Sequence, residues 1–396
     1  YMRKYAILTA LLALITALSG CVQIAMGRAE IDKLFIIRLF SFDETEKGKV
    51  KVTATTKNLS TGDGGQESLL KGESIVSEGE TVFDAVRNMS IFADRKLNAG
   101  HTEFILFGDS LARKGILPYL DFISRHPEFR YNAKLYIVKE GTANSLVEKA
   151  NTSKYFVGDR LARIEEHTGR TSTVGVITLN EALLIFDERY LDTVIPYIEP
   201  VPTRASGEKP GTSDMVMGGY AIFREDKLLY FASREESRGI NWMLNRIGSG
   251  IIVVKDETGQ EISMVIIHGI SKLKPRIEGG KLYCSVEISF VTNIGEIMGG
   301  RSIFDSASLD YLTEQQEKSI KREVENAIRI AQEKNSDHFS IISKFGIKYP
   351  LLRDYFQKNW QKLFPDIKFE VSVDSRIDGT FMITEPVTAS KEAVGE

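Results

Sequence analysis

The chain has 396 residues and a formal net charge of −3, with 51 Lys and Arg against 54 Asp and Glu. This balance provides no basic surface for nucleic acid, so we expect no nucleic-acid partner. With 42% hydrophobic residues, the chain can build the cores of two or three domains. It contains only two cysteines, so packing rather than a disulfide framework must hold those domains together.

The first 21 residues predict a lipoprotein leader. Arg3 and Lys4 precede an apolar run, Tyr5–Ala17, of about 13 residues, which is shorter than the roughly 20 that a membrane-spanning helix needs. The sequence LSGC at 18–21 resembles a bacterial lipobox, in which the cysteine thiol takes a diacylglyceryl group. We therefore predict a signal peptide at 1–20 and lipid attachment at Cys21. Ordinary secretion, with Cys21 a bystander, is the alternative.

Strand and helix patterns alternate through residues 21–199, which predicts an α+β or α/β region. Val82, Val86 and Met89 recur at helical spacing, for example, whereas FILFG is a compact apolar strand. The expected elements are strands at 35–40 and 49–57, a glycine-rich loop at 58–80, a helix capped by Thr81, a strand at 102–108, a helix capped by Asp109 or Ser110 that carries Leu111, Leu117 and Leu120, a strand at 132–138 and a short helix led by Ala143 and Leu146.

A proline-rich segment at 200–214 is the clearest boundary in the chain. Four of the ten prolines lie in it or just before it, namely Pro196, Pro200, Pro202 and Pro210. Proline lacks a backbone donor and resists helices and central strands, so the segment predicts an interdomain linker. It separates the N-terminal region, 21–199, from a C-terminal α+β domain at 215–384, and we expect a flexible tail at 385–396.

The C-terminal domain has its own series of elements. We expect a hairpin at 218–233 with its turn at Glu225–Asp226, strands at 251–256 and 263–291, a long helix at 308–334, a helix that starts at Pro350 and buries Leu352, Phe356, Trp360, Leu363 and Phe364, and a strand at 367–375. The long helix has an apolar stripe of Ile320, Val324, Ile328 and Ala331. Its charges predict ion pairs four residues apart, Glu314–Lys318, Glu317–Lys321 and Glu325–Arg329.

No motif for catalysis or for a cofactor is present. The five histidines, His101, His126, His167, His268 and His338, have no zinc-like spacing, and the chain has no nucleophile elbow, phosphate loop or dinucleotide fingerprint. Cys284 alternates with polar residues in a strand pattern, which places its thiol on the buried face. We therefore predict no catalytic residue, no cofactor and no metal site, and Cys21 is the one residue with an assigned chemical role.

Several longer segments together carry a family resemblance. They are HTEFILFGDSLARKGILPYLDFISRHPEFRYNAKLYIVKEGTA at 101–143, GGYAIFREDKLLYFASREESRGINWMLN at 218–245, VTNIGEI at 291–297, AQEKNSDHFSIISKFG at 331–346 and NWQKLFPDIKFEVSVDSRIDG at 359–379. In this order and spacing the chain resembles the Ger(x)C lipoproteins, the C subunits of spore germinant receptors. Gln332, Asp337, Phe345 and Gly346 match the family pattern after the long helix, although a helix end and a tight turn explain them equally well. The segment VQIAMGRAEID after Cys21 departs from that pattern.

The resemblance implies an elongated, multi-domain α+β lipoprotein with mixed sheets flanked by helices and with two lobes in residues 21–199. It implies a non-enzymatic subunit, anchored by Cys21 on the outer face of the spore inner membrane. The subunit would act with membrane-embedded A and B subunits in response to small nutrients, and direct binding of a small molecule is left open. A solute-binding lipoprotein of a transporter is the first alternative, and it would need two similar α/β lobes. A lipoprotein enzyme is the second.

Overall fold

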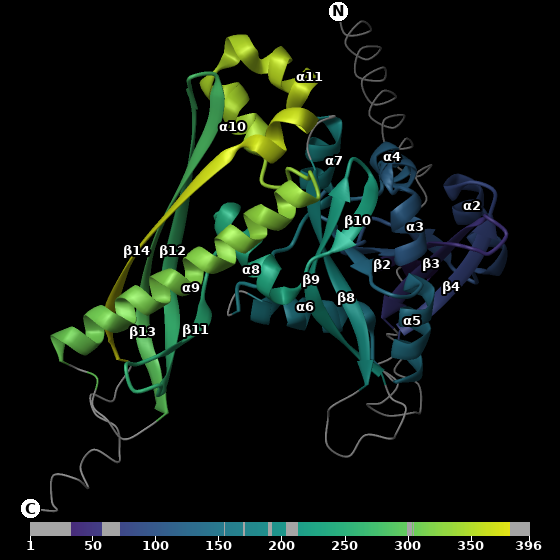
Figure 1. Ribbon diagram of the computed structural model, residues 1–396. Helices are drawn as coiled ribbons and strands as arrows, with labels where there is room; N and C mark the ends of the chain where they lie inside the picture. Colours follow the sequence, from purple (N-terminus) through teal and green to yellow (C-terminus); the bar gives the residue numbers. More distant parts are fainter. Residues whose placement is uncertain are drawn as a thin grey trace, which may run out of the picture.

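The computed structural model describes residues 33–57, 72–153, 155–168, 171–188, 192–202, 213–298, 303 and 305–380. Their strands form sheets of two, four and eight strands, and helices cover these sheets, which confirms the predicted multi-domain α+β class with mixed sheets. Figure 1 shows two parts, one built on the eight-stranded sheet and the other on the four-stranded sheet with the long helix α9. Within the described ranges, no helix is both long enough and apolar enough to cross a membrane.

The eight-stranded sheet has the strand order β10-β9-β8-β7-β6-β2-β3-β4. Its centre, β2-β6-β7-β8, is parallel, and the remaining pairs are antiparallel. The bounds are β2 (Leu39–Glu44), β3 (Val50–Lys57), β4 (Gly72–Gly79), β6 (Phe104–Gly108), β7 (Lys134–Val138), β8 (Thr193–Pro202), β9 (Ser213–Arg224) and β10 (Lys227–Phe231). The strands β1 (Leu34–Ile36) and β5 (Lys96–Asn98) form a separate parallel pair.

Helices cover both faces of this sheet. They are α2 (Val82–Phe92), α3 (Asp109–Lys114), α4 (Leu117–Arg125), α5 (Ala143–Thr152), α6 (Val157–Thr168) and α7 (Leu179–Asp187). Along β6, Phe104 and Leu106 face the core that α5 and α6 complete, whereas Ile105 and Phe107 face the core that α2, α3, α4 and α7 complete. All of β6 is buried, as the unbroken apolar run FILFG predicts for a strand covered on both faces.

The proline-rich segment does not separate the two sheets. Strands β8 and β9 lie on either side of it and pair with each other, Pro200 opposite Met215 and Pro202 opposite Ser213. The predicted hairpin at 218–233 is confirmed as β9 and β10, but both strands extend the sheet of the N-terminal region. Proline is tolerated in β8 because this strand meets β7 only at Tyr197 and Ile198, so elsewhere one edge needs no N–H donor. Residues 203–212 lie outside the described residues.

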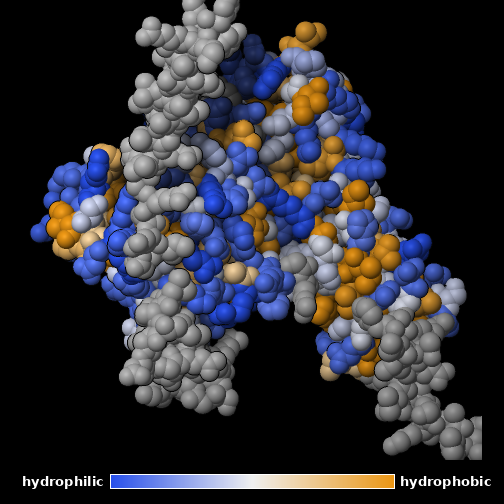
Figure 2. All heavy atoms as spheres, turned by 180° about the vertical axis from the view of Figure 1, so that it is seen from behind, coloured by the Kyte–Doolittle hydropathy of each residue, from blue (hydrophilic) through white to orange (hydrophobic). Residues whose placement is uncertain are grey.

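The second part is a four-stranded sheet with helices on one face. Strands β11 (Gly250–Lys255), β12 (Glu261–Glu278) and β13 (Lys281–Met298) are antiparallel, and β14 (Lys368–Thr380) adds in parallel to β13. The helices are α8 (Arg234–Met243), α9 (Ser306–Glu333), α10 (Ile341–Lys348) and α11 (Arg353–Leu363). Seen from behind in Figure 2, hydrophobic side chains gather on the sheet face opposite α9, where Ile251, Val253 and Ile267 are about half exposed.

The two parts pack against each other through one continuous hydrophobic core, which contains buried residues of both sheets. Trp242 of α8 lies over Gly269 and beside Phe290, with ring centroids 5.7 Å apart. A Cβ at Gly239 would lie 2.6 Å from the carbonyl oxygen of Glu323, so the absence of a side chain lets α8 approach α9 closely. Tyr220 of β9 donates its hydroxyl hydrogen to Asn241 Oδ1 over 2.7 Å. The junction is therefore a packed interface rather than a flexible connection.

Two expectations for the N-terminal region were wrong. Residues 72–79 of the expected loop form β4, which pairs with β3 along its whole length, while 58–71 lie outside the described residues. The helix expected after the strand at 102–108 is two helices, α3 and α4, and no side chain caps the first. Gly115 divides them with φ = +133°, a conformation that only glycine adopts readily. Thr81 caps α2 as predicted.

The long helix of the second part is confirmed, but its ion pairs are partly different. Glu314–Lys318 forms as predicted. Glu317 instead accepts hydrogen bonds from the backbone and the hydroxyl of Ser375, and Arg329 pairs with Glu333. The helix expected from Pro350 begins as a single 3₁₀ turn and leaves Leu352 40% exposed, although Phe356, Trp360 and Phe364 are buried as expected. Helix α10 was not predicted.

Candidate functional site at the junction of the two parts

Cys21, the predicted lipid-attachment residue, lies outside the described residues. Within the described chain, two polar clusters combine several charged side chains. One lies on the N-terminal part alone, and the other joins the two parts.

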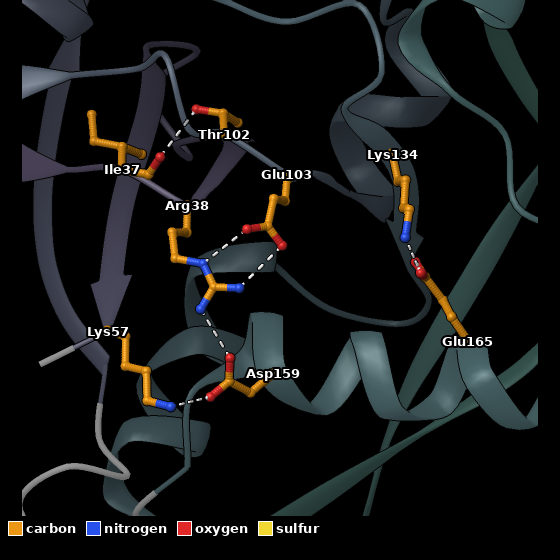
Figure 3. A network of polar contacts seen from close by, with 8 residues as sticks. All are labelled: Ile37, Arg38, Lys57, Thr102, Glu103, Lys134, Asp159 and Glu165. Atoms are coloured by element: carbon orange, nitrogen blue, oxygen red, sulfur yellow. Dashed lines mark hydrogen bonds and ion pairs between the residues drawn. The ribbon is translucent and has the colours of Figure 1, made fainter.

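The first cluster surrounds Arg38 (Figure 3). The Arg38 guanidinium donates to both carboxylate oxygens of Glu103, over 3.1 and 3.0 Å, and to Asp159 over 2.9 Å. Lys57 binds the other Asp159 oxygen at 2.8 Å, while Lys134 pairs with Glu165 nearby. Burial raises the pKa of Asp159, but hydrogen bonds from Lys57 and Arg38 outweigh it and lower the pKa. Every charge has a partner, so this cluster holds α6 against the sheet and leaves no open position for a ligand.

The second cluster links the start of β8 to the end of α9. The buried carboxylate of Asp192 accepts hydrogen bonds from the Ser336 hydroxyl and from the backbone N–H groups of Glu225 and Asp337. Arg224 of β9 donates to the carbonyl oxygens of Lys334 and, over 3.2 Å, Asn335. A side chain of the eight-stranded sheet, Arg224, thus provides a donor for two carbonyl groups just after the end of α9.

Asp337 organises the helices that follow α9. Its carboxylate accepts from the backbone N–H groups of Ile341 and Ile342, at 2.9 and 2.8 Å, and from Trp360 Nε1 at 2.9 Å. It therefore fixes the first turn of α10 and the middle of α11 with one group. Gln332 acts similarly, since its amide donates to three carbonyl oxygens just after α11, including that of Ile367 over 2.9 Å.

The electrostatics of this junction are unusual. Burial raises the pKa of Asp337 to about 7. The two backbone hydrogen bonds act in the opposite direction and lower this pKa, whereas the neighbouring charge of Asp192 raises it further. Burial also raises the pKa of Asp192, while it lowers that of His338 to about 3, so His338 is neutral at physiological pH. Asp337 is thus a carboxyl group that can change its proton occupancy near neutral pH at the contact between the two parts.

A small cleft lies next to this junction, between the end of α7 and the pair α10–α11. Its volume is about 250 Å³, and Ile342, Gly346 and Phe356 form part of its wall. Glu188, just after α7, and Arg353, at the start of α11, bring opposite charges to it. Because Ile342 also donates its N–H to Asp337, the cleft and the acidic cluster share a structural element.

A second, larger hollow of about 790 Å³ lies between α2 and α4. Phe83, Phe122 and His126 form an aromatic wall, with the rings of Phe122 and His126 4.6 Å apart. Tyr119 belongs to its lining, and burial together with the charges of Glu44 and Asp43 raises the pKa of that phenol to about 12. The rim is charged, with Lys114 paired to Glu44 and Arg125 to Asp121.

The structure places the four family-pattern residues in one region. Gln332, Asp337 and Phe345 hold or fill the contact between α9, α10 and α11, and Gly346 borders the cleft. Sequence reasoning missed Asp192, Arg224 and Ser336, because these residues meet only through tertiary contacts. The signal available was the Asp in LDTVIP, a charge next to a strand that is otherwise apolar.

The remaining sequence candidates have structural roles. Cys284 is buried on the inner face of β13 as predicted, and burial raises its pKa to about 12. Within the described residues, no group of His, Cys, Asp and Glu has the arrangement of a metal site.

Comparison with known proteins gives consistent matches along the chain. Residues 27–200 match the family of the spore germination protein N-terminal domain, and 218–380 match the spore germination B3/GerAC-like C-terminal family. Spore germination protein KC of Bacillus subtilis (strain 168) is 22% identical over 97% of this chain and 98% of its own length. Spore germination protein B3 of the same organism is 22% identical over 92% and 95%. The crystal structure of the GerBC protein has the same fold, with a TM-score of 0.56 and 19% identity over 86% of this chain and 96% of that one.

Proposed function

Because the chain belongs to the Ger(x)C family of spore germination proteins, we propose that it is the lipid-anchored C subunit of a spore nutrient germinant receptor. The observation that carries the proposal is the order and extent of the two family matches, which together cover residues 27–200 and 218–380. In this role the subunit lies on the outer face of the spore inner membrane and acts with membrane-embedded A and B subunits. It performs no chemical reaction of its own.

The junction supports a role in assembly rather than in catalysis. Two of its polar side chains are taken up by contacts within the protein: Asp337 accepts from three donors, and the Gln332 amide donates to three carbonyl oxygens. Such contacts fix the orientation of the elements that they join, which a subunit needs if it is to present one surface to its partners. A solute-binding lipoprotein is less well supported, because the two parts have unlike sheets of eight and four strands instead of two similar lobes.

Deletion and complementation in spores test the proposed function. We expect the deletion to abolish or weaken germination in response to one class of nutrient, with vegetative growth and solute uptake unchanged. Restoring the gene should restore germination. Loss of uptake of one solute during vegetative growth, with normal germination, would favour the transporter lipoprotein instead.

Replacing Cys21 tests the proposed anchor separately. Cys21→Ala should abolish the mass increase due to diacylglyceryl and release much of the protein from membranes, because two acyl chains are needed for firm attachment. Cys284→Ala is the matched control, since it removes the other cysteine of the chain and should leave the protein membrane-bound. A Cys21→Ala protein that fractionates with membranes like the wild type would contradict the anchor.

A further inference from the structure

The turn between α10 and α11 carries an apolar patch at one end of the molecule (Figure 1). Leu351 and Ile347 are 98% and 81% exposed, and Leu352 and Tyr355 are exposed as well. These four residues form the apolar tip. Seen from behind in Figure 2, hydrophobic side chains protrude at the upper end of the molecule, where these helices lie. Single exposed leucines are common, but four large apolar side chains so close in the chain mark a contact surface.

Basic side chains accompany the apolar tip. Residues 341–363 include five Lys and Arg and one acidic residue, although the whole chain is slightly acidic. Lys358 and Lys362 are exposed and follow Tyr355 by three and seven residues, which places all three on one face of α11. Within the described residues, no ion pair neutralises either lysine. Positive charge beside an apolar surface is complementary to a surface of anionic lipids.

The two helices that carry the apolar tip are held firmly. Phe345 of α10 packs against Phe356 and Trp360 of α11, and the ring centroids are 5.5–6.2 Å apart. Asp337 accepts hydrogen bonds from backbone N–H groups of α10 and from Trp360 of α11. Because both helices are fixed before any contact is made, little ordering entropy opposes binding at the tip.

We propose that the apolar tip enters the headgroup region of an anionic phospholipid bilayer, with Lys358 at the lipid phosphates. Interfacial helices bury their apolar side chains about 5–10 Å deep, and the helical turn between Tyr355 and Lys358 spans a similar depth. The amphipathic ring of Tyr355 suits the same level. Interfaces between proteins are depleted in lysine, so the charges beside the tip favour lipid over a protein partner.

The proposed anchor at Cys21 would keep the apolar tip close to a bilayer. Cys21 lies 12 residues before Lys33, where the described chain begins, and 12 extended residues span at most about 40 Å. Such a tether gives the tip a high local concentration next to the lipid, so even a weak contact can orient the body. This step alone rests on the proposed function, and the contact itself goes beyond it.

A fluorescent probe on the apolar tip tests its contact with lipid. The full-length chain with Cys284→Ala and Leu351→Cys is labelled with nitrobenzoxadiazole and placed on vesicles of phosphatidylcholine and phosphatidylglycerol. The emission should shift to shorter wavelength, and lipids brominated in their acyl chains should quench it, because the probe lies in the apolar part of the interface. Glu257→Cys is the matched control and should emit as in water, since it lies in the turn before β12, whereas Tyr349 contacts Ile277 near the other end of that strand.

The parent protein with Cys284→Ala alone separates this test from the test of the anchor. Its one remaining cysteine, Cys21, should take up no probe if it carries lipid. Labelling of the parent would contradict the anchor and not the apolar tip. Cys21→Ala is then added to each labelled protein, and the same shift is expected for the probe at position 351.

Partition between buffer and vesicles measures which residues carry the contact. In a Cys21→Ala background, which leaves no acyl chain, Leu351→Asp should lower the partition coefficient by about 10-fold or more. Ile251→Asp, on the exposed sheet face opposite α9, is the matched control and should leave it unchanged. Lys358→Gln should lower it by about 5-fold on vesicles with phosphatidylglycerol and leave it unchanged on phosphatidylcholine alone, whereas Lys255→Gln should change neither value. Melting scans check that each variant keeps its fold.

Three results would overturn the proposal. The first is a probe on Leu351→Cys that emits at the same wavelength on vesicles and in buffer. The second is a Leu351→Asp protein that partitions like its Cys21→Ala parent. The third is a probe that is shielded only in membranes containing other spore proteins, because the apolar tip would then contact a protein partner. Germination of the deletion strain, which tests the proposed function, is unaffected by any of them.

Discussion

The two sheets of this protein differ in how many of their faces are covered. Central strands of the eight-stranded sheet are buried on both faces, and β6 and β7 are accordingly almost wholly apolar. The four-stranded sheet has α9 on one face only, so β11 alternates between buried Ile252 and Val254 and exposed Ile251 and Val253. Because the sequence of β11, GIIVVK, is itself an unbroken apolar run, such a run does not by itself report whether one or both faces of a strand are covered; in β11 only the burial alternates.

The largest change in the free energy of unfolding should come from the sheet that helices cover on both faces. Phe107 of β6 is fully buried, and Phe107→Ala should lower the free energy of unfolding by about 3–5 kcal/mol through lost burial and a new cavity. Val253→Ala on the outer face of β11, where Val253 is 56% exposed, should change it by no more than about 0.5 kcal/mol. Urea unfolding of both variants measures the two changes in the free energy of unfolding. Equal losses would contradict the assignment of covered and open faces.

The junction between the parts should respond to pH through Asp337. Its folded-state pKa of about 7 lies above the ordinary value of 3.8, so its contribution to stability is complete below pH 3.8 and is lost as the pH rises through 7. Asp337→Asn should be less stable than the wild type by about 1–3 kcal/mol at pH 4, because a backbone N–H group loses its acceptor. This difference in the free energy of unfolding should then narrow towards pH 7, because the wild type loses the contribution of Asp337, by at most about 1.4 kcal/mol per pH unit.

Unfolding curves between pH 4 and pH 8 give this gap directly. Asp374→Asn, on the exposed face of β14, is the matched control and should show little difference from the wild type at any pH. Burial lowers the folded-state pKa of His338 to about 3, so His338 makes the stability rise with pH, opposite to Asp337. Because both proteins contain His338, its contribution cancels in the difference between them. A gap between wild type and Asp337→Asn that stays constant with pH would show that Asp337 keeps its ordinary pKa.

Ion pairs of the two parts should also differ in strength. Glu323 on α9 is 5% exposed and accepts from Arg238 over 2.8 Å, so Glu323→Gln should cost about 1–3 kcal/mol because it leaves a mostly buried guanidinium poorly paired. Glu103 in the cluster around Arg38 is 48% exposed, and Glu103→Gln should cost less than about 1 kcal/mol. Thermal unfolding at low and high salt measures both, and only the Glu103 effect should shrink with salt.

The smallest effect concerns the two faces of β13. Cys284→Ala, on the face under α9, should cost about 1 kcal/mol, because it removes one buried sulfur atom. The native thiol should react slowly with a maleimide, since Cys284 is fully buried and burial raises its pKa to about 12. Ser289→Cys places a thiol on the exposed face of the same strand and should react fast in a Cys284→Ala background. Fast labelling of native Cys284 would contradict the covered face.

Local sequence patterns predicted most elements but not their neighbours. The strands at 102–108 and 132–138 are correct because apolar runs bounded by polar residues need no tertiary information. The sequence predicts a loop where β4 forms, because GESIVSEG has few apolar residues and becomes a strand only by pairing with β3. The prolines predict a linker at 200–214, and the sequence does not show that Pro200 and Pro202 pair in β8, a strand with one mostly unpaired edge.

The candidate site was predictable only in part. Asp337 and Gln332 stand in a family-like segment, so sequence reasoning singled them out as helix-end residues, and their hydrogen bonds agree with that role. Asp192 and Glu188 belong to a different part of the chain, and no spacing rule connects them with α10 and α11. The same limit applies to Glu317, whose helical spacing allowed a pair with Lys321 but whose carboxylate binds Ser375 of β14.

Local sequence patterns were enough to predict the α+β class, the N-cap Thr81 of α2 and the buried stripe of α9, because these depend on residues within a few positions of one another. Only the tertiary structure decided that β9 and β10 extend the N-terminal sheet, that Asp192 meets Ser336, and that Glu188 faces the cleft of α10 and α11. Those contacts join residues distant in the chain, and their free energy comes from burial and hydrogen bonding that exist only once both parts are packed together.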